Sequence, residues 1–240
     1  MNEAELSVNT LFGGSLRVAQ PRKGYRFSID SVLLANFVRL RPGERVLDIG
    51  TGCGIIPLYL AKKGHANEMV GVEIQRSLYR SALANRELNG LPNVEFLEGD
   101  IRELQSELRK RPFHVIVSNP PYTKVRSGRK SPHISRLLAR YELELDLSTL
   151  LSLSSSLLVR KGRLYVIYPA LRSSEFIAEA RQAKLEPKRL RFVHSREDER
   201  ACMFLVECVK EAGPGTIVEA PLYVYGDSTY TEEVESYYRV

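Results

Sequence analysis

The stretch VLDIGTGCG, residues 46–54, decides the fold of this 240-residue chain. A short apolar run leads into three closely spaced glycines, Gly50, Gly52 and Gly54, and Asp48 lies two residues before the first of them. Glycine accepts a positive φ and lets the backbone approach a ligand that a Cβ atom would exclude. The pattern therefore predicts a buried β-strand, a ligand-binding turn and then a helix.

On both sides of this stretch, short β-branched runs alternate with helix-length amphipathic segments. Strands are expected at 45–50, 69–74, 93–100, 113–118 and 163–169, and helical segments at 55–64, 75–90, 101–110 and 147–162. Such alternation predicts parallel strands joined by crossover helices, hence a doubly wound α/β sheet. The strands are continuous apolar runs, as expected where helices cover both faces of the sheet.

The two ends of the chain depart from this alternation. Runs at 189–195 and 201–210 are joined by the short charged link REDER and predict an antiparallel hairpin at the end of the sheet. The N-terminal part predicts a turn feeding one helix, with Ser28 or Asp30 near the helix start. The tail predicts a strand, a turn and a short helix.

Composition narrows the class of protein. Hydrophobic residues make up 43% of the chain and charged residues 27%, and no apolar run is long enough to cross a membrane. The first ten residues are acidic and polar, unlike a signal peptide. The three cysteines are too few and too irregularly spaced for a zinc site or a disulfide framework, and the four histidines show no triad or metal spacing. We expect a cytoplasmic protein with no membrane partner and no metal.

Positive charge is concentrated in one segment. The net charge is +6, and residues 121–140 contain six basic residues and no acidic one. The basic residues of this segment are Lys124, Arg126, Arg129, Lys130, Arg136 and Arg140. Such a block is either a solvated loop or a surface that steers a polyanion, and its place directly after the motif NPPY favours the second interpretation.

The acidic residues after the strands indicate which ligand binds. A dinucleotide fingerprint would require glycine at position 55, where the chain has Ile55, and Asp48 would repel a pyrophosphate. A ligand with an ammonium group and no phosphate, such as S-adenosylmethionine (SAM), suits Asp48 instead. Glu73 is placed to accept both ribose hydroxyls, and Asp100 to accept from the adenine amine. Three acids at three successive strand ends line one crevice.

The motif NPPY, residues 119–122, follows the fourth strand and opens into the same crevice. Asn119 supplies a side-chain oxygen and Pro120 a backbone carbonyl, and the rigid Pro120–Pro121 pair fixes both acceptors. Two such acceptors orient the two hydrogens of a planar nitrogen, while Tyr122 offers a face for stacking an extruded base. Methyl transfer then depends on alignment. The structural alternative is a proline-rich turn that ends a strand.

Together, VLDIGTGCG, GVEI (71–74), EGDI (98–101) and SNPPY (118–122) resemble the Rossmann-like SAM-dependent methyltransferases that act on amide- or aniline-like nitrogens. The resemblance implies a seven-stranded, mostly parallel sheet with an antiparallel last strand, SAM as cofactor and S-adenosylhomocysteine as product. The residues it assigns to catalysis are Asn119, Pro120, Pro121 and Tyr122. The residues it assigns to the cofactor are Asp48, Gly50, Gly52, Glu73, Ile74, Asp100, Ile101 and Asn119, with Tyr25, Phe27 and Asp30 at its methionine end. Ordinary turn packing and helix capping are the alternative for the last three.

The segments GYRFSIDSVLLANFV (24–38) and SREDERACMFLVECVK (195–210), with the tail, are similar to those of small bacterial tRNA adenine-N6 methyltransferases of the valine-tRNA type. This resemblance implies transfer to the N6 of adenine in RNA, most simply tRNA, with the basic residues between Lys124 and Arg136 binding the nucleic acid. It also implies one domain, with a cofactor-covering segment at 1–44, a core at 45–210 and a tail at 211–240.

Other functions remain open from the sequence. Protein-glutamine methyltransferases share NPPY but carry a helical domain before the glycine motif, where this chain has only 45 residues before Val46. DNA adenine methyltransferases carry a target-recognition domain, for which we find no room. An rRNA methyltransferase is a further alternative. A SAM-binding RNA-binding module without turnover is the non-enzymatic one, and the intact Asn119 argues against it.

Overall fold

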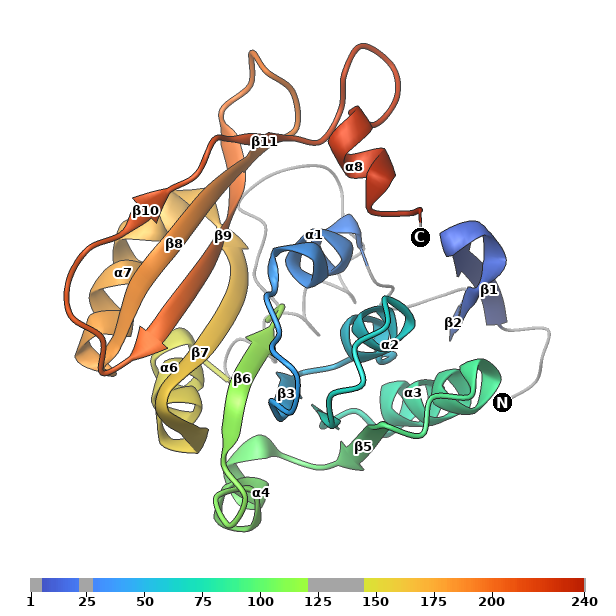
Figure 1. Ribbon diagram of the computed structural model, residues 1–240, viewed down its shortest axis with the longest axis horizontal. Coiled ribbons are helices and arrows are strands. Elements are labelled where there is room, and N and C mark those ends of the chain that lie inside the picture. The colour runs from blue at the N-terminus through green and yellow to red at the C-terminus, as the bar shows by residue number, and fades with distance from the viewer. Residues whose placement is uncertain (1–5, 22–27, 121–144, 240) are drawn as a thin grey trace, which may run out of the picture.

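The computed structural model describes residues 6–21, 28–120 and 145–239. A sheet of nine strands crosses the protein in the order β10-β8-β9-β7-β6-β3-β4-β5, with β11 also pairing with β8 (Figure 1). Its strands are β3 (Val46–Ile49), β4 (Met69–Glu73), β5 (Val94–Glu98), β6 (Phe113–Ser118), β7 (Leu158–Pro169), β8 (Leu185–His194), β9 (Ala201–Lys210), β10 (Ile217–Val218) and β11 (Leu222–Tyr223).

The seven longer strands of this sheet confirm the predicted topology. Strands β3, β4, β5, β6 and β7 are parallel, whereas β9 lies between β7 and β8 and is antiparallel to both. The two-residue strands β10 and β11 extend the sheet beyond β8. The strand order reverses at β3, which pairs with β4 on one side and β6 on the other. Ligands of open α/β sheets bind at the carboxyl ends of strands at such a switch point.

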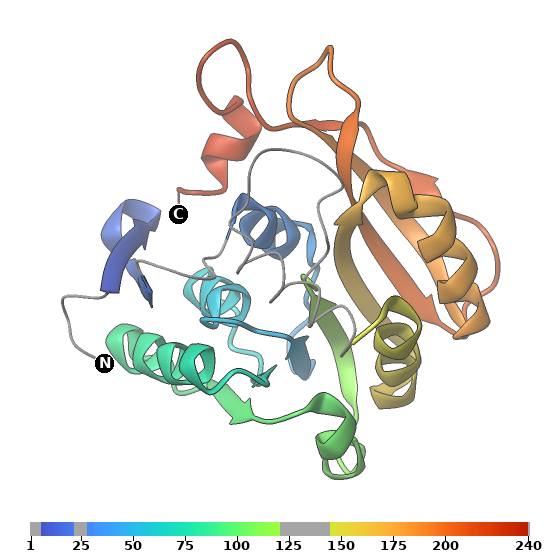
Figure 2. The same cartoon turned by 180° about the vertical axis from the view of Figure 1, so that it is seen from behind.

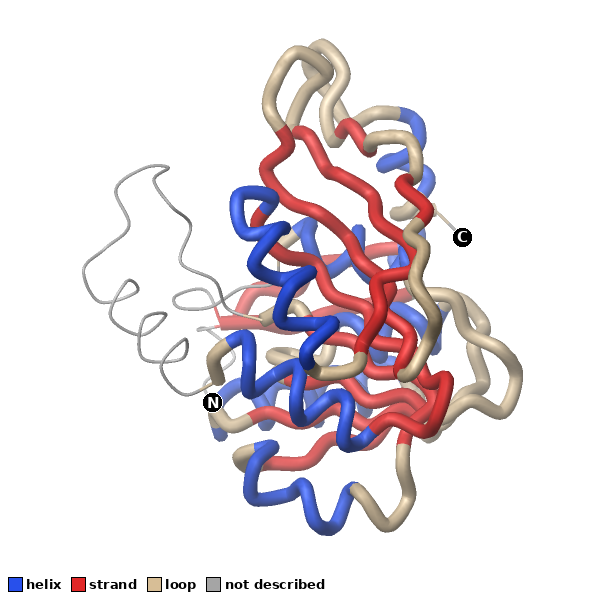
Figure 3. Tube along the Cα trace, turned by 90° about the vertical axis from the view of Figure 1, so that its left-hand side faces the viewer, coloured by secondary structure: helices blue, strands red, loops and turns tan. Residues whose placement is uncertain are grey.

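Helices cover both faces of the sheet. They are α1 (Ile29–Phe37), α2 (Ile55–Lys62), α3 (Arg76–Asn89), α4 (Ile101–Leu108), α6 (Leu147–Leu157), α7 (Ser173–Gln182) and α8 (Glu232–Ser236). One apolar core contains α1, α2 and α3, and a second contains α4, α6 and α7, so the two groups pack on opposite faces (Figures 1 and 3). Among the described residues, no helix is both long and apolar enough to cross a membrane.

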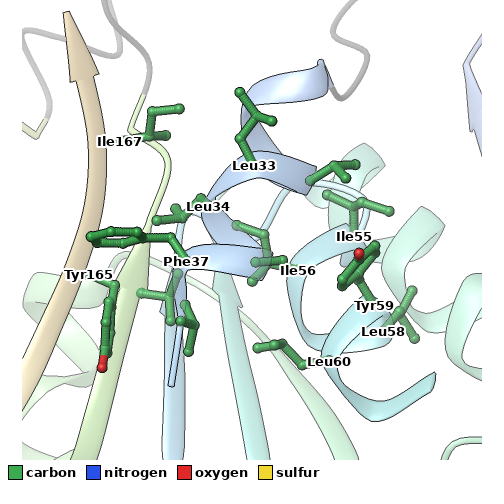
Figure 4. Close-up of a cluster of buried hydrophobic side chains, with 14 of the residues drawn as sticks. Leu33, Leu34, Phe37, Ile55, Ile56, Leu58, Tyr59, Leu60, Tyr165 and Ile167 are labelled. Carbon is green, nitrogen blue, oxygen red and sulfur yellow. The ribbon is translucent and has the colours of Figure 1, made fainter. Parts of the chain in front are cut away.

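Helix α1 is fixed over the sheet by apolar packing. Leu33, Leu34 and Phe37 are buried on α1, which packs against α2 and β7, and the ring of Phe37 points toward Tyr165 (Figure 4). The ring of Phe37 meets that of Tyr165 edge-on, with centroids 6.2 Å apart. Burying a leucine or phenylalanine side chain contributes about 1.5–3 kcal/mol, so this packing holds α1 firmly beside the switch point.

Two of the larger features of the structure were not expected from the sequence. The first is the antiparallel hairpin of β1 (Leu6–Leu11) and β2 (Leu16–Pro21), which lies against α3 (Figure 2). The amide of Phe12, at its turn, donates to the carbonyl of Tyr238, so the hairpin also contacts the C-terminal segment. The second is α7, between β7 and β8.

The boundary between α6 and β7 corrects one expectation. The helical segment was expected to reach residue 162, but α6 ends at Leu157 and β7 begins at Leu158. Leu158 pairs with Phe113, and the register then shifts before Val115 pairs with Arg163. Lys161 takes a φ of 62° within this irregular stretch. A bulge that depends on a neighbouring strand leaves little trace in local periodicity.

Candidate functional site

The glycine turn, residues 50–54, connects β3 to α2 at the carboxyl end of the sheet. The amides of Gly50 and Thr51 both donate to the carbonyl of Val72, at 3.0 Å each. Gly54 has a φ of 85°, and a Cβ there would lie 2.5 Å from the Cζ atom of Phe96. The backbone path and the packing below it therefore both require glycine at the start of α2.

Glu73, the last residue of β4, connects the glycine turn to the neighbouring strand. Its Oε2 accepts from the amide of Gly52 and its Oε1 from the amide of Gln75, both at 2.8 Å. The side chain is nearly enclosed, and burial raises its pKa despite these two hydrogen bonds. A carboxylate has about four lone-pair sites, so some acceptor capacity remains beyond these two amides and the backbone of Ile74, for example for a ribose hydroxyl.

Asp48 is a buried carboxylate within β3, and it is 1% exposed. Neither of its oxygens meets full hydrogen-bond geometry with a described residue, although the nearby Thr51 hydroxyl partly offsets the effect of burial on its pKa. Burial raises the pKa of Asp48 to about 7, and the nearby charge of Glu73 acts in the same direction. A buried carboxylate without a full complement of donors is costly, which makes Asp48 a candidate to receive a donor or cation from a ligand.

The third predicted acid has a structural role that is already visible. Asp100 is the N-cap of α4 and accepts from the backbone amide of Arg102 at 2.8 Å. The guanidinium of Arg102 also contacts its carboxylate, and these interactions hold the pKa of Asp100 below its usual range. Ile101 is buried beside it, whereas Ile74 exposes 43% of its surface after β4. Ile74 therefore offers an apolar face next to Glu73.

Asn119 and Pro120 directly follow β6, the strand on the other side of β3. The Nδ2 of Asn119 donates to the hydroxyl of Ser31 at 3.1 Å, and Ser31 is itself buried in the first turn of α1. Because this contact uses the donor side of the amide, the acceptor Oδ1 faces away from Ser31. Asp30, one residue earlier, accepts from the hydroxyl of Ser28 at 2.8 Å.

The structure thus places Asp48, the glycine turn, Glu73, Asp100 and Asn119 at the carboxyl ends of adjacent strands. The other predicted site residues lie outside the described ranges: Tyr25, Phe27, Pro121, Tyr122, Lys124, Arg126, Arg129, Lys130 and Arg136. Within the described ranges, no three His, Cys, Asp or Glu side chains gather in a way that would hold a metal ion.

Sequence reasoning missed two residues beside the predicted set. Ser31 reaches Asn119 across 88 positions of the chain, and a serine in the first turn of a helix gives no signal of such a contact. Asn85, on α3, donates to the carbonyl of Cys53 in the glycine turn at 3.0 Å. The sequence offered one signal for Asn85. Asn89 lies four residues later, and residues four apart share a helix face, so the two asparagines could act together.

The residues present fit SAM. Glu73 retains acceptor capacity for a ribose hydroxyl, and the buried Asp48 carboxylate suits an ammonium group. A Cβ at Gly50 would meet no described heavy atom within 4 Å, so the first residue of the glycine turn borders open space.

Comparisons with known proteins agree with this geometry. A methyltransferase-domain family model matches residues 40–218. A predicted O-methyltransferase from Agrobacterium tumefaciens shares the fold, with a TM-score of 0.70 and 22% identity over 87% of this chain and 94% of that one.

Two curated relatives extend the match. A tRNA1(Val) (adenine(37)-N6)-methyltransferase from Vibrio cholerae serotype O1 is 30% identical over 95% of this chain and 94% of its own length. The protein of the same name from Tolumonas auensis is 30% identical over 72% of this chain and 74% of its own length. The chain is therefore a SAM-dependent methyltransferase with a methyltransferase domain, and it belongs to the family of the tRNA1(Val) (adenine(37)-N6)-methyltransferases.

Proposed function

We propose that this protein transfers a methyl group from SAM to the exocyclic N6 of adenine in tRNA, at the position beside the anticodon that the names of its relatives give as adenine 37. The observation that carries the proposal is the placement of Asn119, with its amide held by Ser31, beside the strand that bears Asp48. With tRNA as its substrate, the protein would act in the cytoplasm, where tRNA is modified.

The proposed cofactor site is the glycine turn with the acids around it. Glu73 accepts from the ribose hydroxyls, because it still has acceptor capacity after binding Gly52 and Gln75. Asp48 binds the ammonium group of SAM. Asp30, Tyr25 and Phe27 are assigned to the same methionine end of the cofactor. Ile74 and Ile101 pack against the adenine, and Asp100 accepts from its amine while also capping α4.

The proposed catalytic residues orient the nucleophile. When bound, SAM supplies an electrophilic methyl group on its sulfonium. The Asn119 Oδ1 and the Pro120 carbonyl accept from the two N6 hydrogens, which aligns the nitrogen and favours a pyramidal geometry. Pro121 fixes the angle between the two acceptors and Tyr122 stacks the extruded base. The proton that N6 loses after transfer needs no strong base, because a methylated ammonium of this kind is acidic.

The proposed RNA contact is the basic segment that contains Lys124, Arg126, Arg129, Lys130 and Arg136. Its charge suits the phosphates that flank the target nucleotide. Neutralising Lys124, Arg126, Arg129 and Lys130 together should weaken RNA binding at every sequence and flatten its salt dependence. Unchanged binding and salt dependence would leave this segment as a solvated loop.

The proposed substrate is tested with unmodified transcripts. The protein is incubated with methyl-labelled SAM and a valine tRNA transcript, and with the same transcript carrying guanine in place of adenine 37. The proposal expects label in the first transcript only, recovered after digestion as N6-methyladenosine. Equal label in both transcripts would place the target at another nucleotide. Label in neither, with rRNA labelled in a parallel reaction, would favour the rRNA alternative.

A further inference from the structure

Helix α3 holds the outer edge of the N-terminal hairpin through two asparagine side chains. The Oδ1 of Asn85 accepts from the amide of Ala19 at 2.7 Å, and its Nδ2 donates to the carbonyl of Ala19 at 2.9 Å. Asn89 repeats this pair of bonds with Arg17, at 2.9 and 2.7 Å. Each asparagine therefore binds one residue of β2 as a neighbouring strand would.

The spacing of the two pairs explains why a helix can replace a strand here. Residues 85 and 89 are about 6 Å apart along α3, at a rise of about 1.5 Å per residue. Residues 17 and 19 are about 6.6 Å apart along β2, at about 3.3 Å per residue. Because the two spacings nearly match, each asparagine side chain lies opposite the amide and the carbonyl of one residue on the outer edge of β2. The other edge of β2 pairs with β1.

Asn85 makes one contact that Asn89 lacks. The Nδ2 of Asn85 also donates to the carbonyl of Cys53, in the glycine turn, at 3.0 Å. The third bond of Asn89 goes instead to the carbonyl of Asn85, at 2.7 Å. Asn85 is 0% exposed, so both its amide hydrogens and its oxygen are satisfied without water. One buried side chain thus connects the hairpin, α3 and the glycine turn.

This connection completes the support of the glycine turn. The turn is held near its start by the Val72 carbonyl, which accepts from Gly50 and Thr51, and in its middle by Glu73, which accepts from Gly52. Asn85 holds it at Cys53, just before α2 begins. Without Asn85, a buried carbonyl at this end would lack its partner, and the turn would relax to find another donor.

We propose that Asn85 is a positioning residue for the cofactor, which makes SAM affinity depend on the hydrogen bond from Asn85 to the Cys53 carbonyl. Asn85 holds the Cys53 carbonyl and the hairpin in one fixed arrangement, so the glycine turn keeps the shape that binds the ligand. The inference rests on the proposed cofactor site at the glycine turn.

The test compares Asn85→Ala with the matched control Asn89→Ala in the full-length protein. Both variants remove an asparagine that binds β2, but only the first touches the glycine turn. We expect both to lower the melting temperature. Asn85→Ala should weaken S-adenosylhomocysteine binding in calorimetry about tenfold, equivalent to about 1.4 kcal/mol, while Asn89→Ala stays within about twofold of wild type. Amide hydrogen exchange of residues 50–54 should quicken only in Asn85→Ala.

Three outcomes would overturn the role of Asn85. The first is wild-type affinity in a folded Asn85→Ala, and the second is an equal loss of affinity in both variants. If Asn85→Ala does not fold, Asn85→Asp is tested in its place, because it keeps the side-chain volume and the acceptor for the Ala19 amide. The third outcome is that neither variant at position 85 folds while Asn89→Ala does, which would make Asn85 purely structural.

Glu73→Gln, measured in parallel, separates this inference from the proposed cofactor site. A loss of S-adenosylhomocysteine affinity in Glu73→Gln without one in Asn85→Ala would reject the role of Asn85 alone. Wild-type affinity in both would reject the assignment of the cofactor to the glycine turn.

Discussion

Replacing Asp48 by asparagine should make the ligand-free protein more stable at alkaline pH while weakening cofactor binding. Asp48 is buried, and burial raises its pKa to about 7 even though the nearby Thr51 hydroxyl acts in the opposite direction. The difference between an ordinary aspartate pKa and this value means that ionised Asp48 lowers the free energy of unfolding by at most about 4 kcal/mol, at 1.36 kcal/mol per pH unit. Asparagine has no charge to bury, but its own unpaired amide costs about 1–3 kcal/mol.

The sign of the pH dependence follows from proton binding. Between the ordinary pKa of an aspartate and about 7, the native state retains the Asp48 proton and the unfolded state has lost it. Asp48 therefore lowers the stability of the wild-type protein as pH rises. Its full destabilising effect is reached above pH 7. From pH 5 to pH 8 the stability of Asp48→Asn relative to wild type should rise by up to about 3 kcal/mol.

The assay is urea unfolding of ligand-free protein at both pH values, with calorimetric titration of S-adenosylhomocysteine at pH 8. Affinity should fall at least about tenfold, because the amide cannot neutralise an ammonium group. Asp146→Ala is the control of opposite sign, because alanine removes the cap acceptor. Asp146 caps α6 through the amide of Thr149, which lowers the pKa of the aspartate. This control should lose stability at both pH values. An equal loss of stability at pH 5 and pH 8 in Asp48→Asn would refute the reasoning.

Three other substitutions probe separate parts of the account. Asn119→Ala should abolish methyl transfer while S-adenosylhomocysteine affinity stays near wild type, and an equal loss of affinity would contradict the division of roles. Ser31→Ala should lower kcat about tenfold with KM for RNA unchanged, because the Asn119 amide loses the contact that orients it; an unchanged kcat would remove Ser31 from the site. Gly54→Ala should cost about 1–3 kcal/mol of stability in thermal unfolding, because its Cβ would meet Phe96. Gly64→Ala, at a similar φ with open space around it, should cost less.

The parts of the fold with strong local patterns were predictable. The observed bounds of β6 and β9 equal those expected, and β3 and β4 differ by a residue or two. These strands are continuous apolar runs between turn residues, and strands that are covered on both faces of a sheet have such sequences. The acids at the strand ends were also predictable, since parallel strands bring their carboxyl ends to one edge.

The parts that depend on tertiary contacts were not predicted. The β1–β2 hairpin is stabilised by amide groups of α3, more than sixty positions away in the chain. The start of β7 depends on a bulge opposite β6. The contact between Ser31 and Asn119 exists only because α1 packs across the switch point. Asp100 shows a further limit of sequence reasoning. The residue predicted to bind the ligand is also the N-cap of α4, and the sequence pattern does not separate these two roles.

Methyl transfer to tRNA tests the central claim most directly. The protein is incubated with methyl-labelled SAM and, in separate reactions, bulk tRNA, rRNA, duplex DNA and release factors. Each product is then digested, and the labelled component is identified by mass. Labelled N6-methyladenosine from tRNA, lost in Asn119→Ala, is the result that we predict. Label in glutamine or in DNA alone, or cofactor binding with no transfer to any substrate, would contradict it.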